Sequence, residues 1–263
     1  MEKHTFVVLA YKNSEKLESC IQSVLHQSVK TKVVIATSTP NDYIKKMAKK
    51  YDLSVLVNQG EKGIGNDFDF ATNCIESELI TLAHQDDVYE FEYAEKVLKM
   101  YEKYPKSLII FTDYYEIKND QKVTTNLNLK IKRVLLFPLR FRFLSSFRFF
   151  KRQALRFGSA ICCPAVTFVI KNVPKEKFKC DLKCDVDWYA WEKLSKLKGN
   201  FIYIKDKLMG HRIHEESTTT EIIQDHIRTK EDLFMLKKFW PSFIAKAINH
   251  FYVNSEKNNN VKK

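Results

Sequence analysis

The first 115 residues alternate between two hydrophobic periods, and this alternation constrains the fold more than any other feature of the sequence. Short runs rich in β-branched residues predict strands at Thr5–Ala10, Lys32–Thr37, Leu53–Val57, Leu79–Ala83 and Ser107–Thr112. Segments with helical spacing separate these runs, at Glu15–His26, Asp42–Lys50, Asp67–Glu76 and Phe91–Tyr104. Near-continuous apolar strands that alternate with helices are typical of a mostly parallel sheet covered on both faces, so we expect an α/β fold.

Regular structure is expected again beyond a basic stretch. The pattern predicts a strand at Ala165–Lys171, a helix at Asp185–Lys196, a strand at Phe201–Ile204 and helices from Glu221 onward. With 263 residues, 44% of them hydrophobic, the chain can bury a core of its own. No apolar run approaches the ~20 residues that span a bilayer, so any membrane contact would be peripheral.

The six cysteines favour a reducing compartment over a disulfide framework. The N-terminus MEKHTFVVLAYKN lacks the apolar core and the cleavage site of a secretory signal, so we expect free thiols and a cytoplasmic location. Cys180 and Cys184 are close enough in sequence to suggest metal ligands, but no second pair at zinc-finger spacing accompanies them. A zinc site is therefore the less favoured interpretation of this pair.

Polar residues follow each predicted strand, where sheets of this kind bind ligands. The most informative are Asp86 and Asp87, which follow an apolar strand in the segment LITLAHQDDVY. Two adjacent carboxylates are costly unless a cation neutralises them. Mg²⁺ or Mn²⁺ bridging to a diphosphate would do so, since these ions are held by one or two carboxylates and phosphate oxygens. Alternatively, the pair only caps the helix that starts near Phe91.

Four segments in chain order resemble family 2 glycosyltransferases. TFVVLAYKNSEKLESCIQSVLHQS resembles their first strand and helix, and Asp86-Asp87 falls where they carry a metal-binding Asp-x-Asp or Asp-Asp motif. DVDWYAWEKL, with Asp187, Trp188 and Trp191, resembles their acidic motif, and HRIHEEST resembles their His-Arg-x-His segment. The resemblance covers residues 1 to about 220 and implies the GT-A fold, a Rossmann-like, mostly parallel sheet flanked by helices, here with a C-terminal helical extension.

The resemblance also implies an activity and a site. The expected enzyme is a metal-dependent inverting glycosyltransferase that moves a sugar from a nucleotide-sugar donor, a UDP-sugar being favoured, to a glycan or lipid-linked acceptor in surface polysaccharide synthesis. Its cofactor would be Mn²⁺ or Mg²⁺, bound by Asp86, Asp87 and His214. The candidate residues for binding the nucleotide-sugar are Ala10, Tyr11, Asn13, Thr37, Ser38, Lys62, Asp69, Gln85, Asp86, His211 and Arg212.

Asp187 is the preferred catalytic base because it matches the Asp-aromatic motif of the family. Asp185 is the second candidate, since the same stretch also reads as Asp-x-Asp. A purely structural interpretation makes Asp185 the N-cap of the helix and places Asp187 in its first turn, where the helix dipole favours a negative charge. Trp188 and Trp191 are expected in the core more than as platforms for a sugar.

The sequence departs from the family pattern at the end of the second strand. Family members commonly have Asp-Asp-Gly-Ser there, whereas this chain has Ala36, Thr37, Ser38 and Thr39, so the Asp that contacts the base is missing and the two hydroxyls of Thr37 and Ser38 are its candidate replacements. Lys12 and His84 likewise replace a family Asn and Asp, and Asp69-Phe70-Ala71 stands near the place of an Ala-Arg-Asn run. These departures leave open a non-catalytic nucleotide-sugar or nucleic-acid binding module with the same fold.

The basic character of the chain belongs to one segment. The formal net charge is +12, and between Asp120 and Glu176 there are twelve Lys and Arg but no Asp or Glu. Within it, residues 130–157 hold nine Lys and Arg and seven Phe. Their spacing predicts an amphipathic helix, with one apolar face made of Leu139, Phe143, Phe147, Phe150 and Ala154.

Such a helix is expected to lie in an anionic membrane interface, which would place the protein peripherally on the inner face of the plasma membrane. The alternatives are that the Phe face packs on the catalytic domain, or, less favoured, that the segment binds nucleic acid. We therefore divide the chain into a nucleotide-sugar-binding half, an acceptor-binding half and C-terminal helices with a tail. Their respective bounds are 1–115, 116–220 (containing the basic aromatic segment 130–157) and 221–263.

Overall fold

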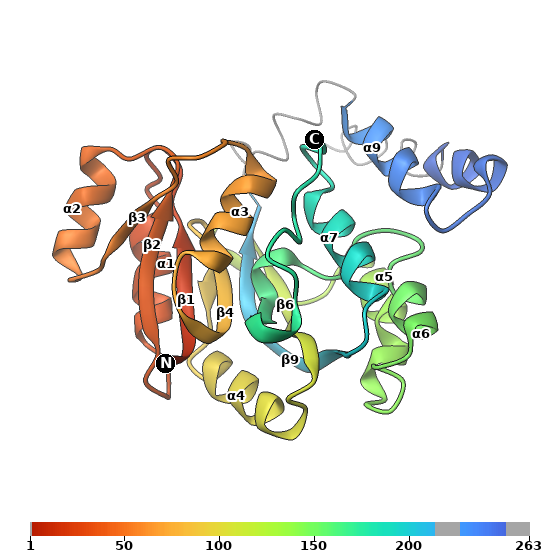
Figure 1. Cartoon of the computed structure of the whole chain (residues 1–263), viewed down its shortest axis with the longest axis horizontal. Helices are drawn as coiled ribbons and strands as arrows, with labels where there is room; N and C mark the ends of the chain where they lie inside the picture. The colour runs from red at the N-terminus through yellow and green to blue at the C-terminus, as the bar shows by residue number, and fades with distance from the viewer. Residues whose placement is uncertain (1, 214–226, 251–263) are drawn as a thin grey trace.

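The computed structural model describes residues 2–213 and 227–250, and they form one mixed sheet with helices on both faces (Figure 1). The strands are β1 (Glu2–Leu9), β2 (Lys32–Thr37), β3 (Val55–Val57), β4 (Ser77–His84), β5 (Val88–Tyr89), β6 (Ser107–Lys118), β7 (Gln121–Val123), β8 (Val166–Val169) and β9 (Asn200–Arg212). The predicted α/β fold is confirmed.

The helices follow the predicted alternation in the first half of the chain. They are α1 (Leu17–Leu25), α2 (Asp42–Lys50), α3 (Ile64–Asn73), α4 (Tyr93–Lys103), α5 (Leu127–Leu135), α6 (Arg148–Gln153), α7 (Val186–Ser195) and α9 (Ile227–Leu236). Short 3₁₀ turns lie at η1 (Phe137–Arg140), η2 (Cys163–Ala165) and η3 (Ile170–Asn172), and residues 242–250 are also helical.

The order of the strands explains why a site forms at one edge of the sheet. The order is β3-β2-β1-β4-β8-β6-β9-β5, with β7 paired to β6. The pairs β2–β3, β1–β2, β1–β4 and β6–β9 are parallel, and β8 lies antiparallel between β4 and β6. β1, β2, β4, β6 and β9 therefore run in the same direction, and their carboxyl ends meet at one edge, where ligands of such sheets bind.

The strands bury apolar side chains on both faces of the sheet. Along β1, Phe6 and Val8 point into one hydrophobic cluster, whereas Val7 points into the other. Buried residues of α1, α2 and α4 complete the first cluster, and those of α3, α7 and α9 complete the second. This two-sided burial is the reason why the strands read as continuous apolar runs instead of alternating ones.

Two predicted strands are longer than the sequence pattern indicated. β6 continues from Thr112 to Lys118, and β9 continues from Ile204 to Arg212, because the two strands remain paired beyond the point where the apolar pattern ends. Shifts of register occur around Asp113, which therefore lies inside β6 and not after it. The two-residue strand β5 was not predicted, since so short a segment has no periodicity to detect.

The single amphipathic helix predicted across residues 130–157 is wrong. The segment instead contains the end of α5, then η1, turns and the six-residue α6. Pro138, which lacks an N–H donor, lies within η1 directly after α5, and a proline there prevents the helix from continuing. The proposed apolar face is accordingly split: Leu139 and Ala154 are buried, but Phe143 and Phe147 are exposed. In the part of the chain that the structure describes, no helix has the length and apolarity needed to cross a bilayer.

Candidate active site

The loops that follow β1 and β4 are joined by hydrogen bonds at the carboxyl edge of the sheet. The side chain of Gln85 accepts from the backbone N–H of Tyr11 (2.9 Å) and donates to the Tyr11 carbonyl (3.1 Å). The Ser14 hydroxyl donates to the Asp86 carboxylate, with Oγ and Oδ1 2.8 Å apart. The predicted residues Tyr11, Gln85 and Asp86 are thus neighbours. Ser14, which sequence reasoning missed, holds the Asp86 carboxylate.

Asp87 connects the same loop to the end of β9. Its Oδ1 lies 3.0 Å from Nδ1 of His211 and accepts from the backbone N–H of Arg212 at 2.9 Å. Asp87 is only 1% exposed, and its Oδ2 is buried without a hydrogen-bond partner among the described residues. Burial alone would raise the pKa of Asp87, but the charge and the hydrogen bond of His211 outweigh it and lower the pKa.

Arg212 brings a second positive charge to this edge. Its Nε donates to the Asp86 carbonyl at 3.1 Å, and its terminal nitrogen donates to the Asp120 carboxylate at 2.7 Å. His211 and Arg212 therefore lie beside the carboxylate pair, as the resemblance implied. His214, the third predicted metal ligand, lies outside the described residues.

Asp187 lies in the first turn of α7, with its carboxylate held by two donors. The Ser159 hydroxyl donates to Oδ2 at 3.1 Å, and the backbone N–H of Trp188 donates to Oδ1 at 2.6 Å. Burial raises the pKa of Asp187, although the Trp188 N–H, the charge of Lys132 and the Ser159 hydroxyl oppose the rise. A carboxylate with a raised pKa is a stronger proton acceptor, which suits a general base.

Asp185 is the N-cap residue of α7, but its side chain makes no capping hydrogen bond. The carboxyl group is buried, and Oδ2 has no hydrogen-bond partner within the described parts of the chain. Burial, and then the negative charges of Asp232 and Asp187, raise the pKa of Asp185 far above its ordinary value. Asp185 therefore holds a proton under conditions in which Asp187 is more readily ionised.

The Glu231 carboxylate of α9 binds the backbone segment that leads into α7, and sequence reasoning missed this residue. Its two carboxylate oxygens accept from the backbone N–H groups of Lys183 (2.8 Å), Cys184 (2.8 Å) and Asp185 (3.1 Å). A negative group at a helix N-terminus satisfies orphan donors and interacts favourably with the helix dipole. No local pattern could have revealed it, because the acceptor comes from a helix far along the chain.

Glu231→Ala is expected to lower the free energy of unfolding by about 1–3 kcal/mol, because three backbone N–H donors, one of them buried, lose their acceptor. The turnover number should also fall, since the segment that leads to Asp187 loses its anchor. Denaturant titration and steady-state kinetics measure the two effects. Lys230→Ala, an exposed change on the same helix, is the matched control, and equal stability of the two variants would contradict the role of Glu231.

The charges of Asp87 and Asp187 both act on the same buried thiol, that of Cys162. Burial raises the pKa of the Cys162 thiol; the charge of Lys132 lowers it, and the charges of Asp87 and Asp187 raise it further. The His211 ring, which binds Asp87, lies 6.2 Å from the ring of Tyr114. Lys132 also donates to the Tyr114 hydroxyl at 3.0 Å, which fixes α5 against β6. Contacts therefore link Asp87, after β4, to Lys132 of α5, whose charge also acts on Asp187 of α7.

Trp188 and Trp191 belong to the core, as expected. Both are buried, and their indole N–H groups donate to the carbonyls of Leu155 (2.9 Å) and Ile161 (3.3 Å). These bonds hold the loop that carries Ser159 against α7. The indole groups therefore position the surroundings of Asp187, whereas the direct contact with its carboxylate comes from the backbone N–H of Trp188.

The ends of β2 and β3 meet around another carboxylate, Asp67 of α3. The Ser38 hydroxyl donates to Asp67 Oδ2 at 2.8 Å, and the Asn58 side chain donates to Oδ1 at 2.7 Å. Thr37 and Ser38 are themselves buried. The Asp67 carboxylate therefore lies close to Thr37 and Ser38, where the family Asp is missing, although Asp67 comes from α3 and not from the end of β2. Sequence reasoning missed Asp67 because the pattern indicated only that a helix begins there.

The remaining candidates lie around this edge at different depths. Ala10 is buried and its N–H donates to the Ala36 carbonyl at 2.9 Å, whereas Asn13 is exposed. Lys62 is exposed and lines a pocket of about 320 Å³ between the start of α3 and residues 180–183. Tyr11 presents about half of its side chain to solvent, so its ring is accessible to a ligand.

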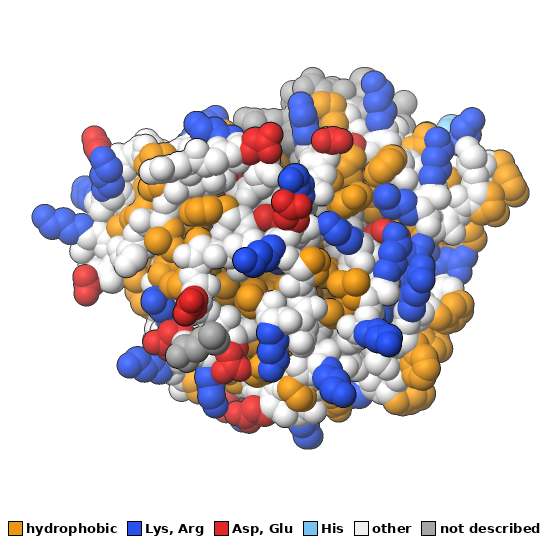
Figure 2. Space-filling model, in the orientation of Figure 1, with side chains coloured by type: hydrophobic (Ala, Val, Ile, Leu, Met, Phe, Trp, Pro, Cys, Tyr) orange, Lys and Arg blue, Asp and Glu red, His pale blue; other side chains and the backbone are white. Residues whose placement is uncertain are grey.

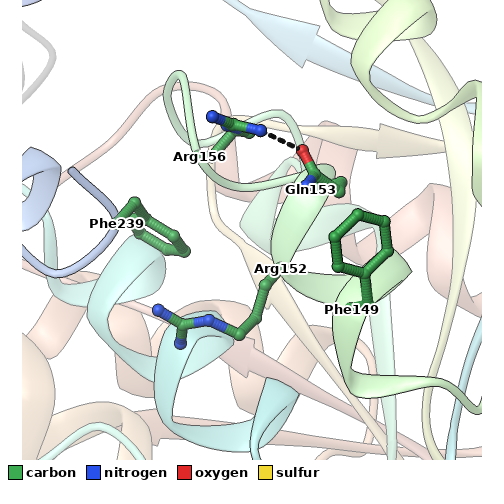
Figure 3. A pocket seen from close by; sticks show the side chains of 5 residues that line it. All are labelled: Phe149, Arg152, Gln153, Arg156 and Phe239. Carbon is green, nitrogen blue, oxygen red and sulfur yellow. Dashed lines mark hydrogen bonds between the residues drawn. The ribbon is translucent and has the colours of Figure 1, made fainter.

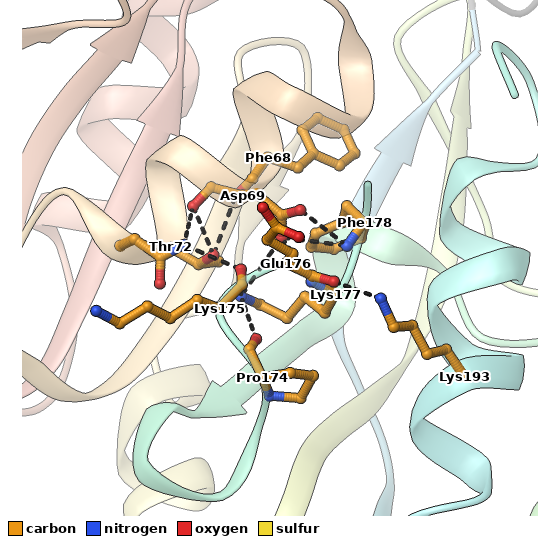
Figure 4. Close-up of polar contacts among 10 residues, drawn as sticks. Phe68, Asp69, Thr72, Pro174, Lys175, Glu176, Lys177, Phe178 and Lys193 are labelled. Carbon is orange, nitrogen blue, oxygen red and sulfur yellow. Dashed lines mark hydrogen bonds and ion pairs between the residues drawn. The ribbon is translucent and has the colours of Figure 1, made fainter. Parts of the chain in front are cut away.

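Asp69 binds the chain's own backbone (Figure 4). Its carboxylate accepts from the N–H groups of Lys177 (3.0 Å) and Phe178 (3.1 Å), and the Lys177 ammonium lies 3.7 Å from Oδ1. Figure 4 shows the side chain of Asp69 pointing from α3 toward this loop. The contacts of Asp69 in the structure are thus with residues that lead toward α7.

The described residues contain no group of three or more His, Cys, Asp or Glu side chains that could hold a metal ion. This is compatible with a site in which one or two carboxylates bind the ion and the phosphates of a ligand complete its coordination. The half-buried Asp86 carboxylate has the hard oxygen donors that Mg²⁺ and Mn²⁺ prefer. The buried, unpaired Oδ2 of Asp87 supplies a second such donor beside it.

Solved structures with the same architecture include glycosyltransferases that bind nucleotide-sugars. Residues 1–349 of TarS from S. aureus match with a TM-score of 0.60 and 13% identity, over 94% of this chain and 69% of that one. The same protein in complex with UDP-GlcNAc matches with a TM-score of 0.59 and 15% identity, over 90% and 71% of the two chains. The mannosyltransferase PcManGT from Pyrobaculum calidifontis, in complex with GDP-Man and Mn²⁺, gives 0.59 and 13%, over 95% and 70%. At these identities the matches establish the fold, so the predicted GT-A fold is confirmed.

A family model gives the assignment. No curated protein matches the sequence. The model described as "Glycosyl transferase family 2" matches residues 5–173, which include β1 to β4, the carboxylate pair and the basic segment. Because this match spans more than half of the chain, the protein belongs to glycosyl transferase family 2, whose enzymes transfer a sugar from a nucleotide-sugar donor.

Proposed function

We propose that the protein is a metal-dependent, inverting glycosyltransferase that acts on a glycan or lipid-linked acceptor in surface polysaccharide synthesis. The observation that supports this most is a series of contacts that links the two acidic motifs. Asp87, after β4, binds His211, whose ring lies 6.2 Å from that of Tyr114. Tyr114 in turn binds Lys132, whose charge acts on Asp187 at the start of α7. An inverting transfer needs two groups: one that stabilises the leaving diphosphate and one that accepts the proton of the attacking hydroxyl.

Asp86 and Asp87 would hold the divalent ion, with His214 as the proposed third ligand. When bound, Mn²⁺ or Mg²⁺ offsets the negative charge of the diphosphate. His211 fixes the Asp87 carboxylate through its 3.0 Å contact, and Arg212 adds positive charge to the same edge through its bonds to Asp86 and Asp120. Both residues would thereby orient the site toward a phosphate ligand.

Asp187 would accept the proton of the acceptor hydroxyl as that oxygen attacks the sugar carbon. Its carboxylate is oriented by Ser159 and by the Trp188 N–H, and burial increases its basicity. The buried Asp185, whose pKa is raised more strongly, is the weaker candidate because a carboxyl group that already holds a proton cannot accept one. Asp185 would then act as a neutral neighbour of the base.

The donor is proposed to lie across the ends of β1, β2 and β4, where Tyr11 offers an accessible ring for stacking on the base. Thr37, Ser38 and the Asp67 carboxylate would supply hydrogen-bond partners for the base, in place of the family Asp. Lys62, in the pocket before α3, would contact a phosphate. A UDP-sugar is favoured, because a carboxylate can accept from the imide N3–H of uracil. The N1–H of guanine is also a ring donor, so a GDP-sugar is the alternative.

A panel of UDP-, GDP- and TDP-sugars tests the proposal by thermal melting with Mn²⁺, with Mg²⁺ or with a chelator. The true donor is expected to stabilise the protein by about 2.7 kcal/mol at 100 times its Kd, and only when the metal is present. Asp86→Ala should lose this stabilisation, whereas the exposed Asp42→Ala should keep it. Donor binding that is indifferent to the chelator would contradict the metal-dependent mechanism.

A further inference from the structure

The outward face of α5 exposes an apolar stripe. Leu127, Ile131 and Val134 are 75%, 51% and 71% exposed, and their spacing of four and three residues aligns them on one side of the helix. On the opposite side, Leu129 is buried. An ordinary surface helix turns its apolar stripe toward the core. The stripe of Leu127, Ile131 and Val134 instead faces outward and does not contribute to packing within the described residues.

The aromatic side chains that follow α5 extend this stripe. Phe137, Phe141, Phe143, Phe147 and Phe149 are all exposed, Phe143 by 70%. The rings of Phe137 and Phe141 are 5.5 Å apart, and those of Phe141 and Phe143 are 6.3 Å apart. These residues gather on η1, the turns and α6, and η1 packs against both α5 and α6. Together with the α5 stripe they form what we call the aromatic-basic surface.

The charge of this surface is positive throughout. Lys130, Arg140 and Arg148 are exposed among its apolar side chains, and the chain has no acidic residue between Asp120 and Glu176. Figure 2 shows orange and blue side chains intermixed at the lower right of the molecule, where Figure 1 places α5 and α6. α2 also exposes Lys45, but its large apolar residues Ile44 and Met47 are buried. Cations alone are thus common on this protein, whereas cations combined with exposed aromatic rings mark this surface.

A pocket at the margin of the surface adds further positive charge (Figure 3). It has a volume of about 270 Å³ and is lined by Phe149, Arg152, Gln153, Arg156 and Phe239. The Arg152 guanidinium donates to the Lys238 carbonyl at 2.8 Å, and Arg156 donates to Gln153 at 2.7 Å. Arg152 also pairs with the buried Glu192 carboxylate, so Arg156 supplies the additional positive charge next to the exposed Phe149.

The chemistry of the surface selects one kind of occupant. A second copy placed symmetrically on it would bring two positive surfaces together, which is unfavourable. A nucleic acid would use the cations and the rings, but it would leave the aliphatic stripe of α5 exposed to water, because that stripe offers no hydrogen bond to a phosphate and no ring for a base to stack on. An anionic lipid bilayer satisfies both components, because its headgroups attract the cations and its interface receives the apolar side chains.

We propose that the aromatic-basic surface docks this protein on an anionic lipid bilayer. The inference deepens the proposed function, on which it rests for the lipid-linked acceptor. α5 joins the two sites: its outward stripe would face the lipid, while its inward Arg133 binds Asp113 at 2.7 Å and its Lys132 binds Tyr114 beside the proposed catalytic site. A helix with its side chains is about 10–12 Å across, so a lipid-linked acceptor would meet the site near the membrane surface.

Co-sedimentation of the full chain with vesicles tests the proposal. We expect binding to vesicles that contain phosphatidylglycerol and little binding to phosphatidylcholine alone. The combined Lys130→Glu, Arg140→Glu and Arg148→Glu variant should lower the partition coefficient about tenfold or more, since each cation near an anionic surface contributes on the order of 1 kcal/mol. The matched control reverses Lys45, Lys46 and Lys49 of α2, makes the same change in net charge, and should bind nearly as well as the parent.

An apolar test separates insertion from a purely ionic contact. Phe143→Ser with Phe147→Ser should weaken binding about tenfold even at low salt, whereas Phe91→Ser, at an exposed position just before α4, should not. Binding that ignores lipid charge, equal loss in both charge-reversal variants, or binding to RNA but not to vesicles would overturn the proposal. So would dimerisation that buries the surface, as measured by light scattering.

These outcomes are independent of the enzymatic proposal. Donor-dependent thermal stabilisation of the same variants, measured without vesicles, reports the sugar-nucleotide site alone. Loss of vesicle binding with donor binding intact supports the docking surface. Absence of donor binding in the parent protein would count against the proposed function and leave the vesicle result standing.

Discussion

Replacing Asp187 by Asn is expected to lower kcat by about 10²–10⁴-fold, the usual contribution of a general base. The amide has the shape of the carboxylate and can keep the local contacts: its oxygen accepts from the Trp188 N–H, and its NH₂ group can donate to the Ser159 hydroxyl, which now donates to Asp187 at 3.1 Å. What the amide lacks is the ability to take up a proton. Binding of the donor should therefore stay unchanged while transfer is lost.

The matched comparison is Asp185→Asn, two residues earlier. Asp185 is buried, and burial together with Asp232 and Asp187 raises its pKa, so the amide replaces a carboxyl group that is already neutral. We expect its kcat to fall by less than about tenfold, well below the contribution of a general base. If instead Asp185→Asn abolished transfer and Asp187→Asn did not, the assignment of the base would have to be reversed.

The pH dependence of transfer gives a second measurement of the same assignment. Burial raises the pKa of Asp187, and the base must be ionised to act, so activity should fall on the acid side at a pH above the ordinary Asp pKa of about 4. Lys132 lies near this carboxylate and opposes the rise. Lys132→Met should therefore move the acid limb of the profile to higher pH.

The fold was predictable where burial repeats along the sequence. The bounds of β2 and α2 agree with the predicted ones, because their apolar pattern starts and ends with the element. β9 was underestimated since its second half, Lys205 to Arg212, includes charged residues that remain in the strand through pairing with β6. The prediction of one helix across residues 130–157 was wrong for a related reason. A 3.6-residue period of apolar residues does not say whether they face a core or water. Pro138 also ends the helical run.

The site was predictable only where its residues lie in local motifs. Asp86, Asp87 and Asp187 follow or begin regular elements, and the resemblance to the family motifs made them candidates. Ser14, Asp67 and Glu231 could not be predicted in this way, because each acts on a partner from a distant part of the chain, and a single sequence contains no information on such pairs. The proximity of Asp67 to Ser38, for example, depends on how α3 packs beside β2.

Replacing Asp69 by Ala is expected to lower the free energy of unfolding by about 3–5 kcal/mol, the usual result of removing one partner of a buried ion pair. The change leaves the backbone N–H groups of Lys177 and Phe178 without an acceptor. It also leaves the Lys177 ammonium, which is 1% exposed, without its counter-charge. The melting temperature should fall on the order of 10 °C, while Glu76→Ala, an exposed change near the end of α3, should leave it within about 1 °C.

The sign of the pH dependence makes this prediction specific to the pair. Burial lowers the pKa of Lys177 to about 8, and the charge of Asp69 opposes this, so removing Asp69 lowers the pKa further below its unfolded value. Between the folded and unfolded pKa values the unfolded chain binds more protons, so stability rises with pH. The loss of unfolding free energy caused by Asp69→Ala should therefore be smaller at pH 9 than at pH 7.

Lys177→Met, which removes the buried charge but keeps the bonds from the backbone to Asp69, should lower the free energy of unfolding less than Asp69→Ala. Equal losses in the two variants would mean that the backbone contacts of Asp69 contribute nothing to the anchoring of this loop.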